Sequence, residues 1–169
     1  IKTCIQDSID TKRRLYENEE LLDKIEAAAT ACITAYKAGG KVLACGNGGS
    51  ASDAQHLVGE LVGRYKIERF GIAAIALNSN VAVMTALGND YSYDEIFSKQ
   101  VRALGKKSDV LFGISTSGNS ANIVKAFEQA KKQGIYTVSL TGEGGGILKE
   151  ISDCNINVPS TDTPRIQES

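Results

Sequence analysis

His56 is the only histidine in the chain, and Glu60 follows it at a spacing of four residues. If both residues belong to one helix, this spacing places the imidazole and the carboxylate on the same face. Such a pair can supply two ligands to a divalent metal, with zinc favoured by the nitrogen, or the carboxylate can act as a base beside a carbonyl group. A pair of this kind also occurs on ordinary helix surfaces, so the surrounding sequence has to decide between these interpretations.

Two loops rich in glycine and hydroxyl groups follow short apolar runs. "GNGGS" begins at Gly46 after "KVLAC", and "STSGNS" begins at Ser115 after "DVLFGI". Glycine lets backbone N–H groups approach an anion, hydroxyl groups add donors, and a helix that begins at the loop adds partial positive charge. Helix capping is the alternative for Ser117 or Ser120. We expect the second loop to bind a phosphate group through Ser115, Thr116, Ser117 and Ser120.

The first loop also matches the dinucleotide-binding pattern G-x-G-x-x-G/A between Gly46 and Ala51. That fold requires an acidic residue at the end of its second strand, whereas "IAAIAL" runs into Asn78, Ser79 and Asn80. No Gly-Lys-Ser/Thr triplet is present, which excludes a nucleoside triphosphate loop. The expected ligand is therefore a small phosphorylated molecule, with no nucleotide cofactor.

The elements that position these residues follow from the apolar periodicity. Residues 1–38 have helical spacing, with Asn18 as a cap for the second helix and Gly39–Gly40 as its end. Apolar runs at 41–45, 72–77, 109–115, 135–140 and, more weakly, 154–159 then alternate with helical stretches at Ser50–Val62, Tyr93–Leu104 and Ala121–Lys132. This alternation predicts an α/β/α sandwich with a mainly parallel five-stranded sheet, preceded by N-terminal helices. Ligands of such sheets lie beyond the carboxyl ends of the strands.

Length and composition narrow the possible classes of protein. With 169 residues, 42% of them hydrophobic, we expect one domain over 1–169, with a helical leader at about 1–38 and an α/β core at about 39–169. The leader is expected to pack on the sheet or on a partner subunit. A net charge of -1 and the absence of a long apolar run favour neither nucleic acid nor membrane as a partner. Four cysteines without paired spacing indicate reduced thiols and a cytoplasmic location.

The sequence resembles the sugar isomerase (SIS) domains, and within them the phosphoheptose isomerases, over nearly its whole length. The segments that carry the resemblance are "AGGKVLACGNGGSASDAQHLVGELVGRY", "TALGNDYSYDEIFSKQVRALG", "DVLFGISTSGNSANIVKAF", "LTGEGGG" and "RIQES". Their order and spacing agree with the family as well as their residues. The resemblance implies an enzyme that interconverts a ketose phosphate and an aldose phosphate.

Individual roles are implied by the same resemblance. Residues that match the family's sugar-phosphate contacts are Asn47, Gly48, Gly49, Glu60, Asn89, Asp90, Ser115, Thr116, Ser117, Ser120 and Gln167. His56, Glu60 and Gln167 match zinc ligands, one zinc ion per subunit, and Glu60 also matches a catalytic acid or base. A further zinc-binding histidine of the family would lie beyond Ser169, so we expect the C-terminal helix to be cut short and the ends to be trimmed.

The implied reaction converts sedoheptulose 7-phosphate into D-glycero-D-manno-heptose 7-phosphate through an enediolate, the first step of ADP- or GDP-heptose biosynthesis. The resemblance further implies a homotetramer with active sites between subunits. Some relatives with this fold are not enzymes and bind the bacterial replication initiator protein, and "KQVRALG" is equally similar to them. The isomerase is favoured over this alternative because Glu60 and the second glycine of "GNGGS" are both present.

Overall fold

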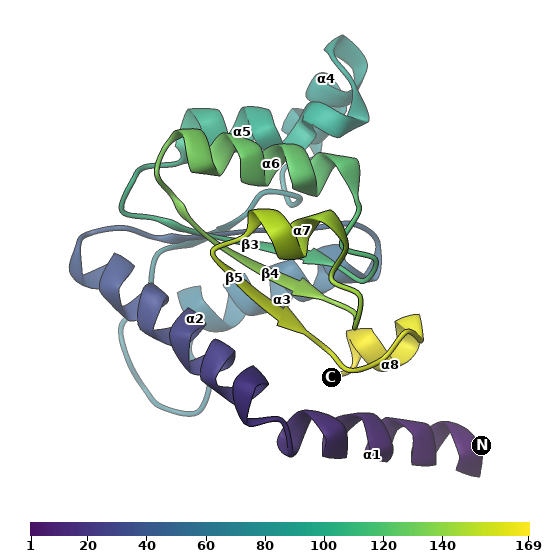
Figure 1. Ribbon diagram of the computed structural model, residues 1–169. Helices are drawn as coiled ribbons and strands as arrows, with labels where there is room; N and C mark the ends of the chain where they lie inside the picture. The colour runs from purple at the N-terminus through teal and green to yellow at the C-terminus, as the bar shows by residue number, and fades with distance from the viewer.

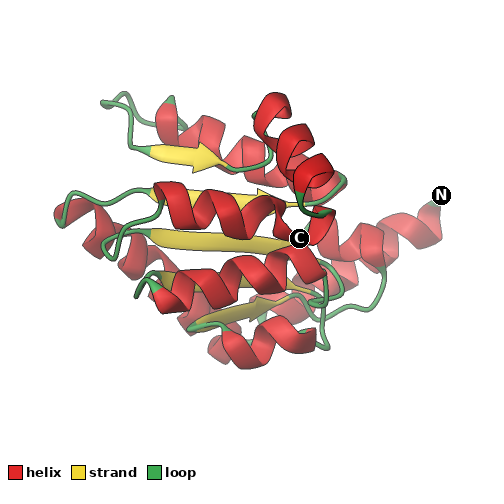
Figure 2. Cartoon of the chain, turned by 90° about the horizontal axis from the view of Figure 1, so that it is seen from above, coloured by secondary structure: helices red, strands yellow, loops and turns green.

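The computed structural model describes residues 1–169 and consists of a parallel sheet between two layers of helices (Figure 1). The strands are β1 (Val42–Gly46), β2 (Ala74–Ala76), β3 (Val110–Ser115), β4 (Tyr136–Thr141) and β5 (Cys154–Asn157). Their order in the sheet is β2-β1-β3-β4-β5, every pair is parallel, and all the strand arrows point the same way (Figure 2). The predicted five-stranded α/β/α sandwich is confirmed.

The helices form two unequal layers. One layer holds α4 (Val81–Asp90), η1 (Tyr93–Glu95), α5 (Ile96–Leu104), α6 (Ala121–Lys132) and α7 (Gly146–Ile151). The other layer holds α2 (Glu19–Lys37) and α3 (Gly49–Val62), while α1 (Lys2–Tyr16) and α8 (Thr163–Gln167) contact each other beside it (Figure 1). Helices cover both faces of the sheet, and β1 and β3 are accordingly apolar, whereas β4 and β5 also bury Thr137, Ser139 and Asn155.

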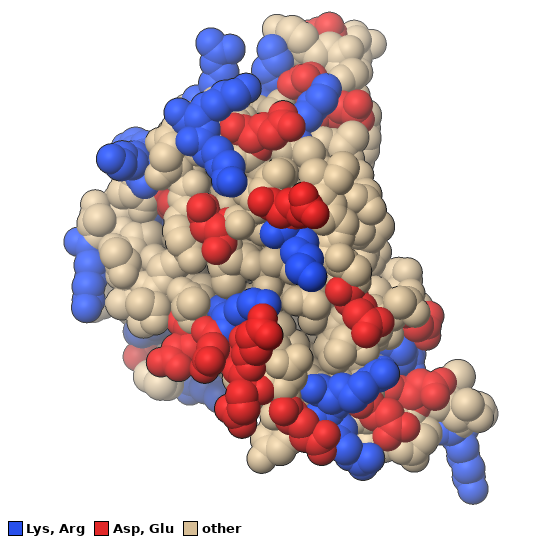
Figure 3. Space-filling model, viewed as in Figure 1, with Lys and Arg blue, Asp and Glu red and all other residues tan.

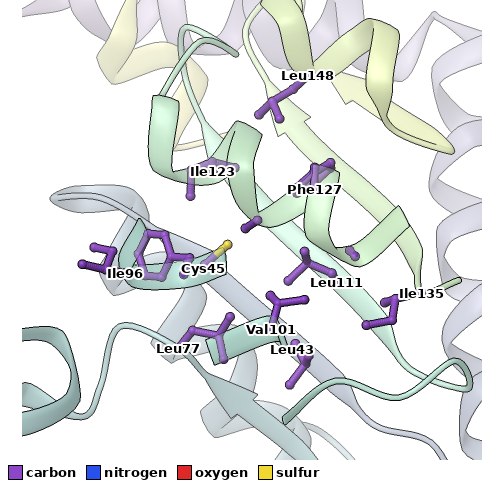
Figure 4. Packing of buried hydrophobic residues seen from close by; sticks show 13 residues of the cluster. Leu43, Cys45, Leu77, Ile96, Val101, Leu111, Ile123, Phe127, Ile135 and Leu148 are labelled. Atoms are coloured by element: carbon purple, nitrogen blue, oxygen red, sulfur yellow. The ribbon is translucent and has the colours of Figure 1, made fainter. Parts of the chain in front are cut away.

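The larger core lies between the sheet and the layer of α5, α6 and α7. Leu43 and Leu111 pack there against Phe97 of α5 and Phe127 of α6, and all four side chains are fully buried (Figure 4). Gly113 of β3 permits this contact, since a Cβ atom at that position would collide with the Phe127 ring. Alternation along β1 and β3 directs the intervening residues to the opposite face.

The opposite face of the sheet is covered by α2. Ala28 and Ala35 pack against Val110, Val138 and Cys154, so the second predicted helix of the leader does contact the sheet. The predicted cap is also present, because the Asn18 side chain accepts a hydrogen bond from the Leu21 amide at 3.1 Å. Small residues on α2 allow its backbone to approach the strands closely.

The first helix behaves differently from the second. Ile5, Ile9 and Tyr16 repeat at helical spacing on α1, yet all three side chains are exposed. Figure 1 shows α1 extending away from the sheet, with the N-terminus at its far end. The apolar face that the sequence assigns to α1 is therefore uncovered within this chain.

Two helices and one cap were not anticipated. Residues 81–90 form α4, whose sequence "VAVMTALGND" contains no charge before Asp90 and so lacks a polar face to define a helical period. Residues 146–151 form α7, which follows the glycine run and is only six residues long. The last helix begins at Thr163, and Asp162 occupies its cap position without a capping hydrogen bond.

Charged residues of both signs are interspersed over the face of Figure 3. Basic side chains are most frequent toward α5 and α6, where Lys99, Arg102, Lys125 and Lys132 accompany Glu95 and Glu128. Lys125 pairs with Glu95 at 2.9 Å, so part of this positive charge is neutralised locally. None of the helices combines the length and the apolar character that a membrane span requires.

Candidate functional site

The site lies where the connections of the sheet change direction. The chain passes from β1 outward to β2 on one side, and β3 returns to pair with β1 on the other side. Gly46 at the end of β1 is paired with Ile114, one residue before the end of β3. In an open α/β sheet this reversal leaves a crevice beyond the carboxyl ends of the two strands, which is the usual place for a ligand. The two glycine- and hydroxyl-rich loops are thus neighbours at one edge of the sheet.

A reciprocal pair of amide side chains joins these loops. Asn47 Nδ2 donates to Asn122 Oδ1 at 2.9 Å, and Asn122 Nδ2 donates to Asn47 Oδ1 at 2.9 Å. The Tyr93 hydroxyl adds a third hydrogen bond to Asn47 Oδ1 at 3.1 Å. Asn122 lies in the first turn of α6 and is only 3% exposed. The pair therefore sets the position of the β1 loop relative to the start of α6.

The loop after β3 presents a cluster of hydroxyl groups at the N-terminus of α6. Ser115 Oγ lies 2.9 Å from Ser120 Oγ and 3.5 Å from Ser117 Oγ. Ser120 occupies the cap position of α6 but makes no capping hydrogen bond. Its side chain therefore does not act as an ordinary helix cap. Ser117 accepts a hydrogen bond from the Asn119 amide at 3.2 Å. The backbone N–H groups of Ala121 and Asn122 have no acceptor within the chain, whereas those of Ile123 and Val124 donate to the Ser120 carbonyl at 3.0 Å.

The loop after β1 turns directly into α3. Gly48, the residue before the helix, has a φ of 57°, which is a backbone conformation that glycine adopts without strain. A Cβ atom at Gly49, the first helical residue, would collide with the side-chain amide of Gln167. The two glycines therefore serve different purposes, one for the turn and one for the close approach of α8.

His56 and Glu60 share one face of α3, as their spacing predicts. His56 Nε2 lies 3.3 Å from Glu60 Oε1, and the two side chains are 76% and 37% exposed. Their donor chemistry fits part of a zinc site, since an imidazole nitrogen and a carboxylate oxygen are adjacent and accessible. No group of three or more His, Cys, Asp or Glu side chains is close enough to bind a metal ion within this chain.

Gln167 lies at the other end of the same stripe of α3. Positions 49, 53, 56 and 60 lie on one face of α3. Gln167 contacts Gly49. At a rise of 1.5 Å per residue, Gly49 is about 10 Å from His56 along the helix axis. Gln167 also lines a cavity of about 320 Å³ with Asp53, Ser50 and Thr116. Burial raises the pKa of the Asp53 carboxyl, and the nearby His56 opposes that shift. The structure thus brings Gln167 to the N-terminal end of this stripe, and no hydrogen bond joins it to His56 or Glu60.

Asn89 and Asp90 lie at the C-terminal end of α4 and are exposed. Their side chains hydrogen-bond to each other at 2.9 Å and to no residue of either loop. Figure 1 shows α4 at the edge of the molecule. The contact of these two residues with the sugar phosphate stays a prediction.

The chain is similar to known proteins over its whole length. The family model described as "SIS domain" matches residues 6–142. A phosphoheptose isomerase of Sulfurimonas denitrificans is 49% identical over 169 residues, which are 100% of this chain and 87% of the relative. One from Aneurinibacillus thermoaerophilus is 50% identical and is covered over 85% of its length. The chain belongs to the phosphoheptose isomerase family of SIS-domain proteins. A solved phosphoheptose isomerase structure from Neisseria gonorrhoeae matches with a TM-score of 0.92 at 42% identity, over 99% of this chain and 89% of that one.

Three side chains of this phosphoheptose isomerase family member were not singled out from the sequence. Asn122 and Tyr93 hold the β1 loop through Asn47, and Arg69 bonds to the end of α3. Asn122 could have been recognised from the sequence, because it lies four residues before Ala126 and therefore on the buried face of α6. A polar residue on an apolar stripe requires a hydrogen-bond partner. No comparable signal marks Tyr93 or Arg69.

Proposed function

We propose that this chain isomerises sedoheptulose 7-phosphate to D-glycero-D-manno-heptose 7-phosphate, the first step of ADP- or GDP-heptose biosynthesis. The observation that carries this conclusion is the identity of 49% and 50% to named phosphoheptose isomerases over the whole chain. The neighbouring loops at the ends of β1 and β3 support it, since they offer donors for a charged group at the expected edge of the sheet.

The phosphate group is assigned to the loop after β3. Ser115, Thr116, Ser117 and Ser120 supply hydroxyl groups there, together with the free N–H groups at the start of α6. We assign the sugar to Gly48, Gly49, Asn89, Asp90 and Gln167. Asn47 is assigned a backbone contact, because Asn122 and Tyr93 already engage its side chain. Asn89 and Asp90 are assigned to the site of a neighbouring subunit, since their side chains hydrogen-bond to each other and to neither loop of their own chain.

Glu60 is the proposed group for proton transfer. Its carboxylate removes a proton from C1 of the ketose, and the electron pair shifts to give the enediolate with its charge on oxygen. The proton of the C1 hydroxyl passes to the C2 oxygen, and return of a proton to C2 then leaves the carbonyl at C1 and a hydroxyl at C2, so no redox cofactor or second substrate is consumed. The carboxylate is partly accessible and adjacent to His56, which supports its availability to a ligand.

We propose that His56, Glu60 and Gln167 contribute to a zinc site, with one ion per subunit. When bound, zinc would polarise the carbonyl oxygen and stabilise negative charge. His56 and Glu60 satisfy the donor chemistry, and we assign the joining Gln167 to another copy of the chain because Gln167 contacts Gly49 and makes no hydrogen bond to either side chain within one chain. This arrangement requires active sites between subunits.

A homotetramer is proposed for the same reason. Exposed apolar side chains occur on α1, at Ile5, Ile9 and Tyr16, and in the segment after α3, at Ile67 and Phe70. Phe70 is 97% exposed, which is unusual for a large apolar side chain and is typical of a protein–protein interface. A cytoplasmic location is supported by the four free thiols of the chain.

The test is to incubate the protein with sedoheptulose 7-phosphate and to follow the aldose by NMR. We expect conversion, its loss after treatment with a chelator, and its recovery when zinc is added. No aldose from zinc-loaded protein would refute the isomerase proposal. Full conversion by chelated, metal-free protein would refute the zinc proposal alone. The alternative of a module that binds the replication initiator is not favoured by any contact in the structure.

A further inference from the structure

One arginine holds the C-terminal end of α3. Arg69 Nη1 donates to the carbonyl oxygens of Leu61 at 2.9 Å, Gly63 at 3.1 Å and Phe70 at 3.0 Å, and Nη2 donates to that of Glu60 at 2.6 Å. The last carbonyl groups of a helix have no partner within the helix, and the planar guanidinium with its five donors suits several of them at once. A single side chain therefore satisfies the end of the helix that carries Glu60.

The segment that carries Arg69 folds back under this helix end. The Ile72 amide donates to the Leu61 carbonyl at 2.9 Å, and a Cβ atom at Gly71 would collide with the Val62 carbonyl. From Val62 to Gly71 every residue is exposed except Arg69, which is half-buried. Apart from the close backbone contacts at Gly71 and Ile72, Arg69 is thus the attachment of this segment to α3.

Arg69 binds the backbone of Glu60, the residue to which we assign proton transfer. The shortest of the four hydrogen bonds is to the backbone of Glu60 itself, and that backbone sets the direction in which the Glu60 side chain leaves the helix. The positive charge also compensates the partial negative charge at the end of the helix. Without Arg69, the Glu60 carbonyl would lose its donor and the Leu61 carbonyl would keep only the Ile72 amide, so the last turn of α3 would be held less firmly.

We propose that Arg69 is a positioning residue for the isomerisation, which holds the last turn of α3 so that the Glu60 carboxylate is aligned with the sugar carbons. This proposal rests on the proposed function. Displacement of a catalytic group by about 1 Å can cost roughly 100-fold in rate. The phosphate loop at the start of α6 is built from other elements, so the affinity for the sugar phosphate does not depend on Arg69.

The experiment compares Arg69→Ala, Arg69→Lys and the wild-type protein with sedoheptulose 7-phosphate. We expect Arg69→Ala to lower kcat by about 100-fold, with KM changed by less than about threefold. Arg69→Lys should recover part of the rate, because one ammonium group cannot reach all four carbonyl groups. Added guanidinium ion at millimolar concentration should raise kcat of Arg69→Ala and leave the wild-type rate unchanged. Lys66→Ala is the control, since Lys66 is exposed in the same segment and its recorded contact is with the Tyr65 ring.

Two outcomes would overturn the assignment. One is a wild-type kcat in Arg69→Ala. The other outcome combines two results. In each variant, kcat falls by the same factor as the fraction of protein that binds the sugar phosphate in calorimetry, and guanidinium does not restore the rate. A merely structural role of Arg69 predicts this combination. A wild-type protein without isomerase activity would refute the proposed function, and the positioning role with it. An active wild-type protein with an equally active Arg69→Ala variant would refute the positioning role alone.

Discussion

The reciprocal amide pair between the two loops makes a quantitative prediction. Asn122→Ala removes both hydrogen bonds to Asn47, each 2.9 Å long, from a position that is only 3% exposed. A hydrogen bond contributes about 0.5–1.5 kcal/mol net to stability, so two of them correspond to about 1–3 kcal/mol. We therefore expect the free energy of unfolding to fall by that amount. For a domain of this size the midpoint should fall by about 2–12 °C.

The assay is urea denaturation of the wild type, Asn47→Ala, Asn122→Ala and the double variant. If the pair acts as a unit, the double variant should lose about 1–2 kcal/mol less than the sum of the two single variants. Gln6→Ala is the matched control, because this amide is exposed on α1 and bonds only to Asp10. Its effect should add to that of Asn122→Ala within about 0.5 kcal/mol.

The same four proteins test whether the Asn47–Asn122 pair also contributes to ligand binding. Since Asn122 ties the β1 loop to the start of α6, its loss should also weaken binding of the sugar phosphate, measured by calorimetry on the same four proteins. Strict additivity of Asn47→Ala and Asn122→Ala would show that the two amides do not act on each other, and the reasoning would be wrong. An unchanged free energy of unfolding in Asn122→Ala would contradict it equally.

Three further predictions concern the proposed site and the buried thiols. Glu60→Gln should abolish turnover and leave calorimetric affinity for the sugar phosphate nearly intact; undiminished turnover would remove Glu60 from the mechanism. Ser117→Ala combined with Ser120→Ala should weaken that affinity by about 1–3 kcal/mol, through the loss of charge-assisted donors, and an unchanged affinity would place the phosphate elsewhere. Burial raises the pKa of the Cys45 thiol, so at pH 8 iodoacetamide should label exposed Cys4 well before Cys45, as mass spectrometry would detect; equal rates of labelling would contradict the burial of Cys45.

Much of the fold could be predicted because it depends on local periodicity. The apolar runs and the helical stretches between them indicate a parallel sheet covered on both faces, since backbone geometry sets the two periods. The shared face of His56 and Glu60 is local for the same reason, and the 3.3 Å contact between them agrees with it. The hydroxyl cluster from Ser115 to Ser120 was also recognisable, because all its members lie in one loop.

Helices without a clear polar face were harder to predict. Residues 81–90 are apolar almost throughout, so no period separates a buried side from an exposed side, and Asn89 and Asp90 could not be placed from the pattern. The sequence also did not predict that Ile5 and Ile9 on α1 are exposed. Periodicity identifies an apolar face, but it does not identify what covers that face.

The sequence by itself determined the five strands, most of the helices, the parallel direction of the sheet and the chemistry at the strand ends. Only the tertiary structure decided that β1 and β3 are neighbours, that Asn47 meets Asn122 across 75 residues, and that Arg69 reaches the end of α3. The physical reason is the range of the interactions. Helical and strand periods follow from the backbone within a few residues, whereas strand order and the partners of buried polar groups depend on how all the apolar faces of the chain pack together.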